Sequence, residues 1–160
     1  MRLVIAAVGR LKDGPERELY QRYAKRVDDG GRSLALGPLR LAELPEGRAA
    51  GMEQRRTDEA QRLLEASRDC EVRVALDGAG KMLSSESLAQ WIGAQRDGGT
   101  KSLAFLIGGP DGHGAFALEA AQMKLSLGPM TLPHGLARLI LVEQLYRAEA
   151  ILSGHPYHRG

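Results

Sequence analysis

The sequence predicts an α/β fold with a mostly parallel sheet flanked by helices. Short, continuously apolar runs that are typical of buried strands alternate with longer segments whose apolar residues recur at helical spacing. No linker or repeat divides the 160 residues, a length that suits one domain with its own core. Such alternation favours parallel strands connected by helices on both faces of the sheet.

The first part of the chain contains two expected strands and two expected helices. Residues 3–8 are apolar throughout and end at a glycine, which predicts a buried strand. A proline suits the first turn of a helix over 15–29, and a Gly-Gly pair ends it. Alternating leucines predict a strand over 34–41, and the Gly-Pro pair inside it indicates a sheet edge or a bulge. A polar, arginine-rich helix is expected over 47–68.

The second part continues the alternation. The expected elements are strands at 71–77 and 102–107, helices at 84–96, 114–125 and 135–152, and a short extended run at 130–132. Ser84 and Ser85, with Glu86 close by, mark the start of one of these helices.

Composition indicates the general class of protein but does not identify its binding partner. The net charge of +2 permits a polyanionic partner, but no dense basic stripe announces one. The candidate basic contacts are Arg17, Arg22, Lys25, Arg26, Arg55 and Arg56, which are interleaved with acids. Cys70 is the single cysteine, so no intrachain disulfide forms, and the apolar opening is too short for a signal peptide or a membrane span. We therefore expect a cytoplasmic protein without a membrane contact.

Three glycine-bearing loops follow expected strands, at 76–80, 108–112 and 128–133. In open α/β sheets, ligands bind beyond the carboxyl ends of the strands, where these loops converge. Neither a G-x-G-x-x-G fingerprint nor a P-loop is present, so the loops favour a ligand that is held by backbone groups rather than by its phosphates. The structural alternative is that they are simply tight turns.

Several ordered motifs carry a family resemblance: LIGGPDG at 106–112, LSLGPMTLPH at 125–134, LVEQLYRA at 141–148 and HPYHR at 155–159. In these motifs the chain resembles the RlmH family of the SPOUT superfamily, bacterial methyltransferases that act on N3 of a pseudouridine in 23S rRNA. The resemblance covers the whole chain. It implies a SPOUT α/β-knot fold in a single domain over 1–160, with a carboxyl-terminal trefoil knot in a cofactor-binding part at about 72–160. It also implies a homodimer that acts on the ribosome.

The resemblance implies that S-adenosylmethionine is bound at the three loops. The residues that match the family's cofactor pocket are Leu76, Gly108, Gly109, Gly128, Pro129, Met130, Thr131, Leu132 and Pro133. Leu76, Met130 and Leu132 could form an apolar floor for adenine while backbone groups satisfy its polar edge. Asp111 departs from the pattern, because the family more often has a glutamate there.

The carboxyl-terminal tail holds the candidate catalytic residues His155, Tyr157, His158 and Arg159. N3 of a neutral pseudouridine carries a proton, so a base must remove it or a donor must stabilise the developing anion. Arg159 could do the latter or anchor a phosphate, and Tyr157 could stack on a base. Two histidines with a distant cysteine make a poor zinc site, so we expect no metal.

Three further polar residues have ordinary structural explanations beside functional ones. His134 follows a cofactor loop and could pack or cap there. Glu143 and Arg147 stand four residues apart on the last expected helix, which is the spacing of a helical ion pair.

The last helix is apolar in every quadrant, which indicates cover by a second subunit or burial within one chain. In a dimer, each tail could complete the partner's cofactor site. Two other functions stay open: a related SPOUT enzyme that acts on tRNA or another rRNA site, and a non-catalytic RNA-binding module with the same fold.

Overall fold

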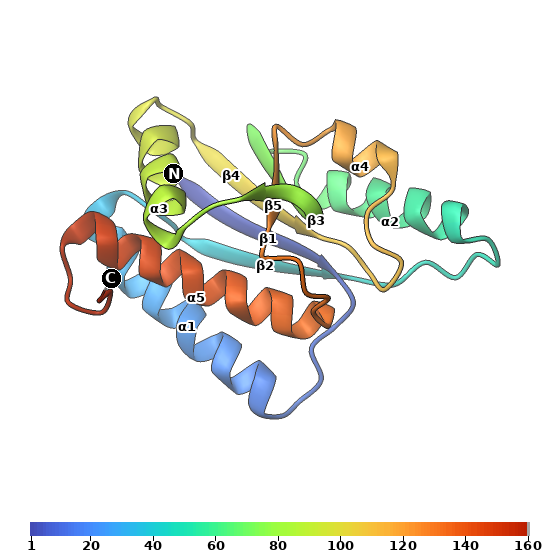
Figure 1. Cartoon of the computed structure of the whole chain (residues 1–160), viewed down its shortest axis with the longest axis horizontal. Helices are drawn as coiled ribbons and strands as arrows, with labels where there is room; N and C mark the ends of the chain where they lie inside the picture. Colours follow the sequence, from blue (N-terminus) through green and yellow to red (C-terminus); the bar gives the residue numbers. More distant parts are fainter. Residues whose placement is uncertain (160) are drawn as a thin grey trace.

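The computed structural model describes residues 1–159 and contains a single parallel sheet within them (Figure 1). The strands are β1 (Arg2–Val8), β2 (Leu39–Leu44), β3 (Val72–Met82), β4 (Ser102–Ile107) and β5 (Met123–Ser126). Their order across the sheet is β2-β1-β4-β3-β5, and every pair of neighbours is parallel. Gly160, the last residue of the expected domain, lies outside the described residues.

Helices cover both faces of this sheet (Figure 1). They are α1 (Pro15–Gly31), α2 (Met52–Ala66), α3 (Ser85–Asp97), the short α4 (Ala115–Glu119) and α5 (His134–Ser153), with a 3-10 turn at Arg32–Leu34. On one face, α1, α3 and α5 pack over strand residues such as Ile5 and Phe105. On the other face, Leu63 of α2 packs over strand residues such as Val4 and Leu106. The predicted α/β fold with a helix layer on each face is confirmed.

Most expected elements appear close to their predicted bounds, and the differences have physical reasons. The expected strand over 34–41 was wrong at its start: residues 32–34 form the 3-10 turn, and β2 begins at Leu39, after the Gly-Pro pair. Its expected position at a sheet edge is confirmed. The helix expected over 47–68 begins at Met52, because residues 45–51 form the connection from β2 to α2.

The expected helix over 114–125 and the extended run at 130–132 were both wrong. The helix ends at Glu119, and residues 123–126 form strand β5. Gln122 explains the change: its backbone N–H donates to Arg73 O at 2.9 Å, and its Oε1 accepts from Arg73 N at 2.7 Å. This pairing with β3 removes the chain from the helix, whereas residues 130–132 lie in the loop that follows β5.

Strand β3 is longer than the expected strand over 71–77 because it continues through the first glycine loop. Leu125 of β5 pairs with both Leu76 and Lys81, so the register shifts and the residues between them bulge out of the ladder. Gly80 permits this, since a Cβ there would lie 2.7 Å from the backbone of Lys124. The loop predicted at 76–80 is therefore a bulge within strand β3. It lies on the side of the sheet where the strands have their carboxyl ends, and the other two loops lie there too.

Helix α5 is packed between α1 and α3, and this explains most of its apolar surface. Leu141, Val142 and Leu145 are fully buried within one chain, whereas Leu136 and Ile140 each stay 37% exposed. Packing within one chain therefore buries most sides of helix α5. Within residues 1–159, no helix is long and apolar enough to cross a membrane.

Candidate active site

A cleft of about 680 Å³ opens beyond the carboxyl ends of β3, β4 and β5 and reaches the first turn of α5. All nine residues predicted to bind the cofactor line it: Leu76, Gly108, Gly109, Gly128, Pro129, Met130, Thr131, Leu132 and Pro133. The three loops, which lie far apart in the sequence, are therefore brought together at one place. Its volume lies within the range of about 300 to 1,000 Å³ that is typical of small-molecule sites.

Other residues line the cleft that were not predicted to bind the cofactor, although most of them lie in the loops and motifs that the sequence singled out. They are Asp77, Gly78, Ile107, Pro110, Gly112, His113, Leu125, Leu127, His134 and Ala137. Most of them neighbour a predicted residue, so strand ends and loop flanks were the available signal. His113 carried no such signal, because its place behind the 108–112 loop depends on the fold.

The chemical character of the lining suits a neutral base and a cation better than phosphate groups. Among the described residues that line the cleft there is no lysine or arginine, whereas Asp77 brings a carboxylate. Ile107, Leu125 and Ala137 contribute apolar surface. A sulfonium-bearing nucleoside fits this set, because its adenine requires apolar walls with backbone partners and its cation requires no basic side chain.

Met130 does not serve in the apolar floor that the sequence suggested. Its side chain is 80% exposed, so it lies at the rim of the cleft. Leu125, in strand β5, also lines the cleft and is 2% exposed.

The loop over 108–112 closes on itself. Gly112 N donates to Gly109 O at 2.9 Å, and the two residues form an isolated antiparallel bridge. A Cβ on Gly108 would lie 3.0 Å from the backbone carbon of Gly112 and 3.1 Å from His113 N. Glycine at 108 therefore lets the two arms of the loop approach each other, which leaves backbone groups at the cleft wall.

The two histidines of the cleft have different surroundings. His113 is buried, and its Nε2 lies 3.1 Å from Leu106 O, to which it donates. Burial lowers the pKa of the His113 imidazole, so this side chain is neutral near pH 7. His134 is the first residue of α5, and its Nε2 would lie 3.0 Å from a Cβ on Gly9, so it packs against the loop after β1.

The predicted catalytic tail does not lie at the cleft of its own chain. It follows the carboxyl end of α5, whereas the cleft lies at the amino end (Figure 1). The 20 residues of α5 separate the two by about 30 Å, at 1.5 Å per residue. Within one chain, His155, Tyr157, His158 and Arg159 thus cannot reach a ligand in the cleft.

Tyr157 holds the tail against α5. Its hydroxyl donates to Glu143 Oε1 at 3.0 Å and lies 3.1 Å from the Tyr23 hydroxyl. Its ring centroid lies 4.6 Å from that of Tyr146 and 4.9 Å from the guanidinium carbon of Arg147. Burial, followed by the hydrogen bonds to Tyr23 and Glu143, raises the pKa of Tyr157 far above its usual value. In this arrangement Tyr157 is a hydrogen-bond donor rather than a base.

His158 joins the tail to two helices. Its Nε2 lies 2.9 Å from Glu86 Oε1, and its Nδ1 lies 3.3 Å from Arg147 Nη1. Because arginine only donates, Nδ1 accepts and Nε2 carries the proton that Glu86 accepts. Arg147 also forms the expected ion pair with Glu143, at 2.6 Å. Arg159 is exposed at the end of this segment.

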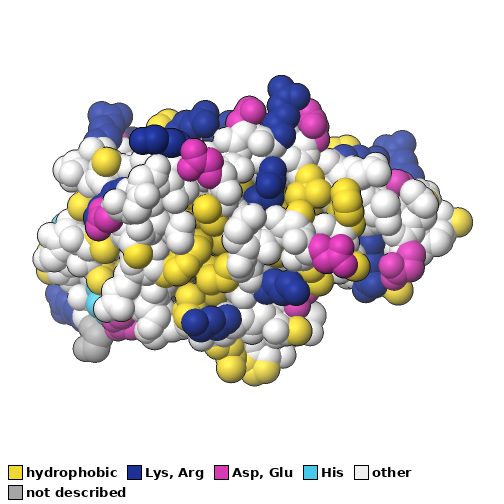
Figure 2. Space-filling model, turned by 90° about the horizontal axis from the view of Figure 1, so that it is seen from above, with side chains coloured by type: hydrophobic (Ala, Val, Ile, Leu, Met, Phe, Trp, Pro, Cys, Tyr) yellow, Lys and Arg dark blue, Asp and Glu magenta, His cyan; other side chains and the backbone are white. Residues whose placement is uncertain are grey.

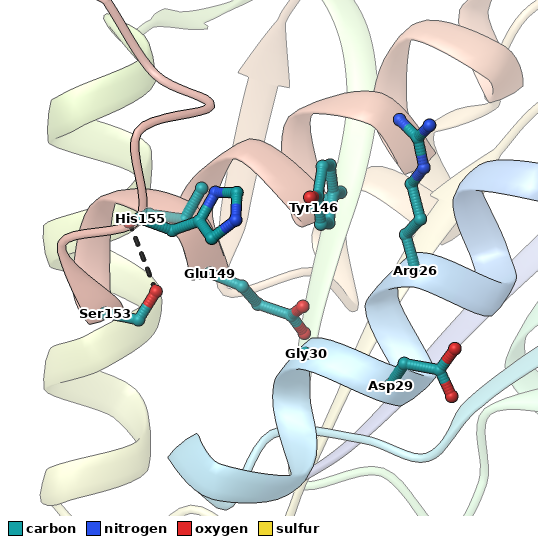
Figure 3. Close-up of a pocket in the computed structure, with 8 residues that line it drawn as sticks. Arg26, Asp29, Gly30, Tyr146, Glu149, Ser153 and His155 are labelled. Atoms are coloured by element: carbon teal, nitrogen blue, oxygen red, sulfur yellow. Dashed lines mark hydrogen bonds between the residues drawn. The ribbon is translucent and has the colours of Figure 1, made fainter.

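A second, smaller cavity of about 330 Å³ lies beside the tail, between α1 and α5 (Figure 3). Figure 3 shows Glu149 extending from α5 toward Gly30 of α1, with Tyr146 and His155 beside it. Glu149 is 3% exposed, and neither of its carboxyl oxygens has a hydrogen-bond partner. Burial raises the pKa of Glu149 to about 8.

Basic residues are scattered over the surface. Figure 2 shows Lys and Arg side chains interspersed with Asp and Glu on the face in view, without a continuous stripe. Of the candidate basic contacts, Lys25 pairs with Asp29, and Arg26 lies over the rings of Tyr23 and Tyr146. Arg55 contacts Asp111.

Comparison with known proteins gives consistent matches over the whole chain. A family model described as "Predicted SPOUT methyltransferase" matches residues 1–158. The ribosomal RNA large subunit methyltransferase H of Xanthobacter autotrophicus is 48% identical over 159 residues, which cover 99% of each protein. The protein of the same name from Nitrobacter hamburgensis is 45% identical over 160 residues and 100% of each. Among solved structures, a probable methylase family protein from Haemophilus influenzae has a similar fold, with a TM-score of 0.52 at 12% identity over 99% of this chain and 70% of that one.

Proposed function

The chain belongs to the SPOUT methyltransferase family, and we propose that it transfers a methyl group from S-adenosylmethionine to N3 of a pseudouridine in bacterial 23S rRNA. Two relatives that match over nearly their full length are named ribosomal RNA large subunit methyltransferase H, which supports an rRNA substrate. The proposed place of action is the ribosome in the cytoplasm. The knotted threading of residues 72–160 that the family implies is part of this proposal.

The observation that carries the proposal is the cleft at the carboxyl ends of β3, β4 and β5. The backbone of residues 128–133 and of Gly108 and Gly109 would hold adenine by its edge, while Leu76 and Leu125 pack against its faces. The carboxylate of Asp77 would lie near the positively charged sulfonium of the cofactor. When bound, the sulfonium supplies an electrophilic methyl group, so the residues of the cleft need only orient it.

The distance between cleft and tail supports a homodimer with shared sites. The tail is about 30 Å from the cleft of its own chain, so its polar groups can serve the reaction only at the cleft of another copy. Leu136 and Ile140 are exposed in the first turns of α5, and Met130 is exposed at the rim nearby. We propose that these apolar groups contribute to the contact between the two copies.

In this dimer the tail acts through hydrogen-bond donors. Tyr157 keeps its proton, and the only proton-accepting nitrogen of His158 already accepts from Arg147. His155 Nδ1 accepts from Tyr157 N at 3.2 Å. The exposed guanidinium of Arg159 is therefore the group best placed to stabilise the anion that develops as N3 loses its proton. Water or a group of the RNA would then receive that proton.

Mass spectrometry of 23S rRNA tests the substrate. RNA from cells that lack the gene should contain an unmethylated pseudouridine, and expression of this chain should restore the methyl group. Purified protein and S-adenosylmethionine should methylate ribosomes from the deletion strain, whereas Arg159→Ala protein should bind the cofactor without methylating them. An identical methylation pattern in both strains would rule out this substrate, and failure of the wild-type protein to bind the cofactor would favour a non-catalytic RNA-binding module.

A further inference from the structure

Helix α2 contacts the cofactor loop over 108–112 from behind, through three side chains on two adjacent turns. Arg55 Nε donates to Asp111 Oδ2 at 2.7 Å, and Arg55 Nη2 donates to Asp111 Oδ1 at 3.4 Å. Arg56 Nε donates to the backbone oxygen of Asp111 at 2.8 Å. Adjacent arginines thus bind both the side chain and the backbone of the same loop residue.

The third contact of helix α2 with the loop is between Glu59 and Gly109, the glycine at the cleft wall. A Cβ on Gly109 would lie 3.0 Å from Glu59 Oε2 and 3.2 Å from Glu59 Oε1. Glu59 is 3% exposed, and its Oε1 accepts from Gly47 N at 2.8 Å, which ties it to the connection before α2. Glu59 therefore sets a rigid rear wall for Gly109, while the arginines hold the loop two residues further on.

The charge environment of Arg55 indicates that its main role is the contact with Asp111 in the loop. Its side chain is 28% exposed and that of Asp111 is 24% exposed, so the pair is partly shielded from water. The hydrogen bond from Arg55 lowers the pKa of the Asp111 carboxyl, and the same bond raises the pKa of Arg55. Arg55 also donates to the backbone oxygens of Ala49 and Ala50, at 3.0 and 2.9 Å. Because its N–H donors are used in these hydrogen bonds, Arg55 has few donors available for an RNA phosphate.

We propose that Arg55 is a positioning residue for the cofactor site: its paired contact with Asp111 holds the 108–112 loop in the form that binds S-adenosylmethionine, which presupposes the proposed function of the cleft. Asp111 is not among the lining residues, so its carboxylate acts on the loop and not on the cofactor.

Calorimetric binding of S-adenosylhomocysteine to the full-length protein tests the proposal. The Arg55→Met and Asp111→Asn variants should each raise the Kd by about tenfold, because a displaced loop loses its aligned backbone contacts. The double variant should bind no more weakly than Arg55→Met alone, since Asp111→Asn then removes only a contact that is already absent. Hydrogen exchange at residues 108–114 should rise in all three, while the melting temperature stays close to that of the wild type.

Arg62→Met is the matched control. Arg62 is on the same helix and donates to a backbone oxygen, that of Pro45 at 2.8 Å, but it does not contact the loop. This variant should bind the ligand as the wild type does. In steady-state assays, Arg55→Met should raise the KM for S-adenosylmethionine and leave the KM for RNA unchanged.

Two results would overturn the proposal. An Arg55→Met protein that binds the ligand with wild-type affinity but binds rRNA more weakly would assign Arg55 to the RNA surface. Additive losses in the double variant would show that Arg55 and Asp111 act separately. If the wild-type protein itself does not bind the ligand, the proposed function of the cleft fails, which distinguishes that failure from the failure of the Arg55 contact.

Discussion

Glu149 is a buried carboxyl group whose charge state should set the pH dependence of stability. Its pKa is raised from 4.5 to about 8, first by burial and second by the negative charge of Asp28. A carboxyl with a raised folded-state pKa binds its proton more tightly in the folded chain than in the unfolded chain. Its contribution to stability is therefore complete below about pH 4.5 and is lost as the pH rises toward 8.

Replacing Glu149 by Gln should remove this loss. Each pH unit between the two pKa values costs about 1.4 kcal/mol, so the wild type should lose about 3 kcal/mol of unfolding free energy from pH 5 to pH 7 through this group. Urea denaturation at several pH values measures it, with Glu119→Gln, an exposed position, as the control. Equal pH slopes for the wild type and Glu149→Gln would show that Glu149 is ionised and paired in solution.

Residue-level predictions from the sequence succeeded where a motif carried them. The motifs at 106–112 and 125–134 contain every residue predicted for the cleft except Leu76, because consecutive residues of a loop stay together in the fold. The Arg55 to Asp111 contact could not be predicted, since 56 residues separate the pair and an arginine among acids looks like any solvated charge. The burial of Glu149 without a hydrogen-bond partner could not be predicted either, because it depends on how α1 and α5 pack.

At the scale of elements, local signals predicted helix starts better than they predicted short strands. The serines before α3 correctly marked its beginning, and the continuous apolar run correctly marked β4. Strand β5 was missed because its four residues gain their conformation from pairing with β3, which a local pattern does not contain. The bulge in β3 was missed for the same reason.

The amino-terminal cap of α3 gives a test at this scale. Ser84 Oγ accepts from Ser87 N at 3.1 Å, which satisfies one of the free N–H groups at the start of the helix. Ser84→Ala should lower the unfolding free energy by about 1 kcal/mol, whereas Ser84→Gly should cost only a few tenths, measured by urea denaturation. Ser87→Ala keeps the N–H and serves as the control. Ser84 Oγ also donates to Ser87 Oγ at 3.1 Å, and equal losses in Ser84→Ala and Ser87→Ala would show that this contact matters instead.

At the scale of the whole molecule, the fold separates two groups that the sequence places close together. The cofactor loop at 128–133 and the tail at 155–159 flank the same helix, so the motifs suggest a single site, but α5 is straight enough to hold them at opposite ends (Figure 1). No sequence pattern reports which end of a helix faces another copy. The proposed shared site rests on this length together with the homodimer that the family resemblance implies.

Mixing two inactive variants tests whether sites are shared. Gly108→Ala should disable the cleft, because its Cβ would lie 3.0 Å from the loop backbone, and Arg159→Ala should disable the tail. After the chains exchange, half of the dimers should be mixed, and each should combine one intact cleft with the partner's intact tail. The mixture should then recover about a quarter of wild-type activity toward ribosomes. Circular dichroism first establishes that each variant is folded, and a mixture of two Arg159→Ala preparations is the control. If mixed dimers form, as native mass spectrometry can show, but activity stays at that of the control, the tail does not complete the partner's cleft.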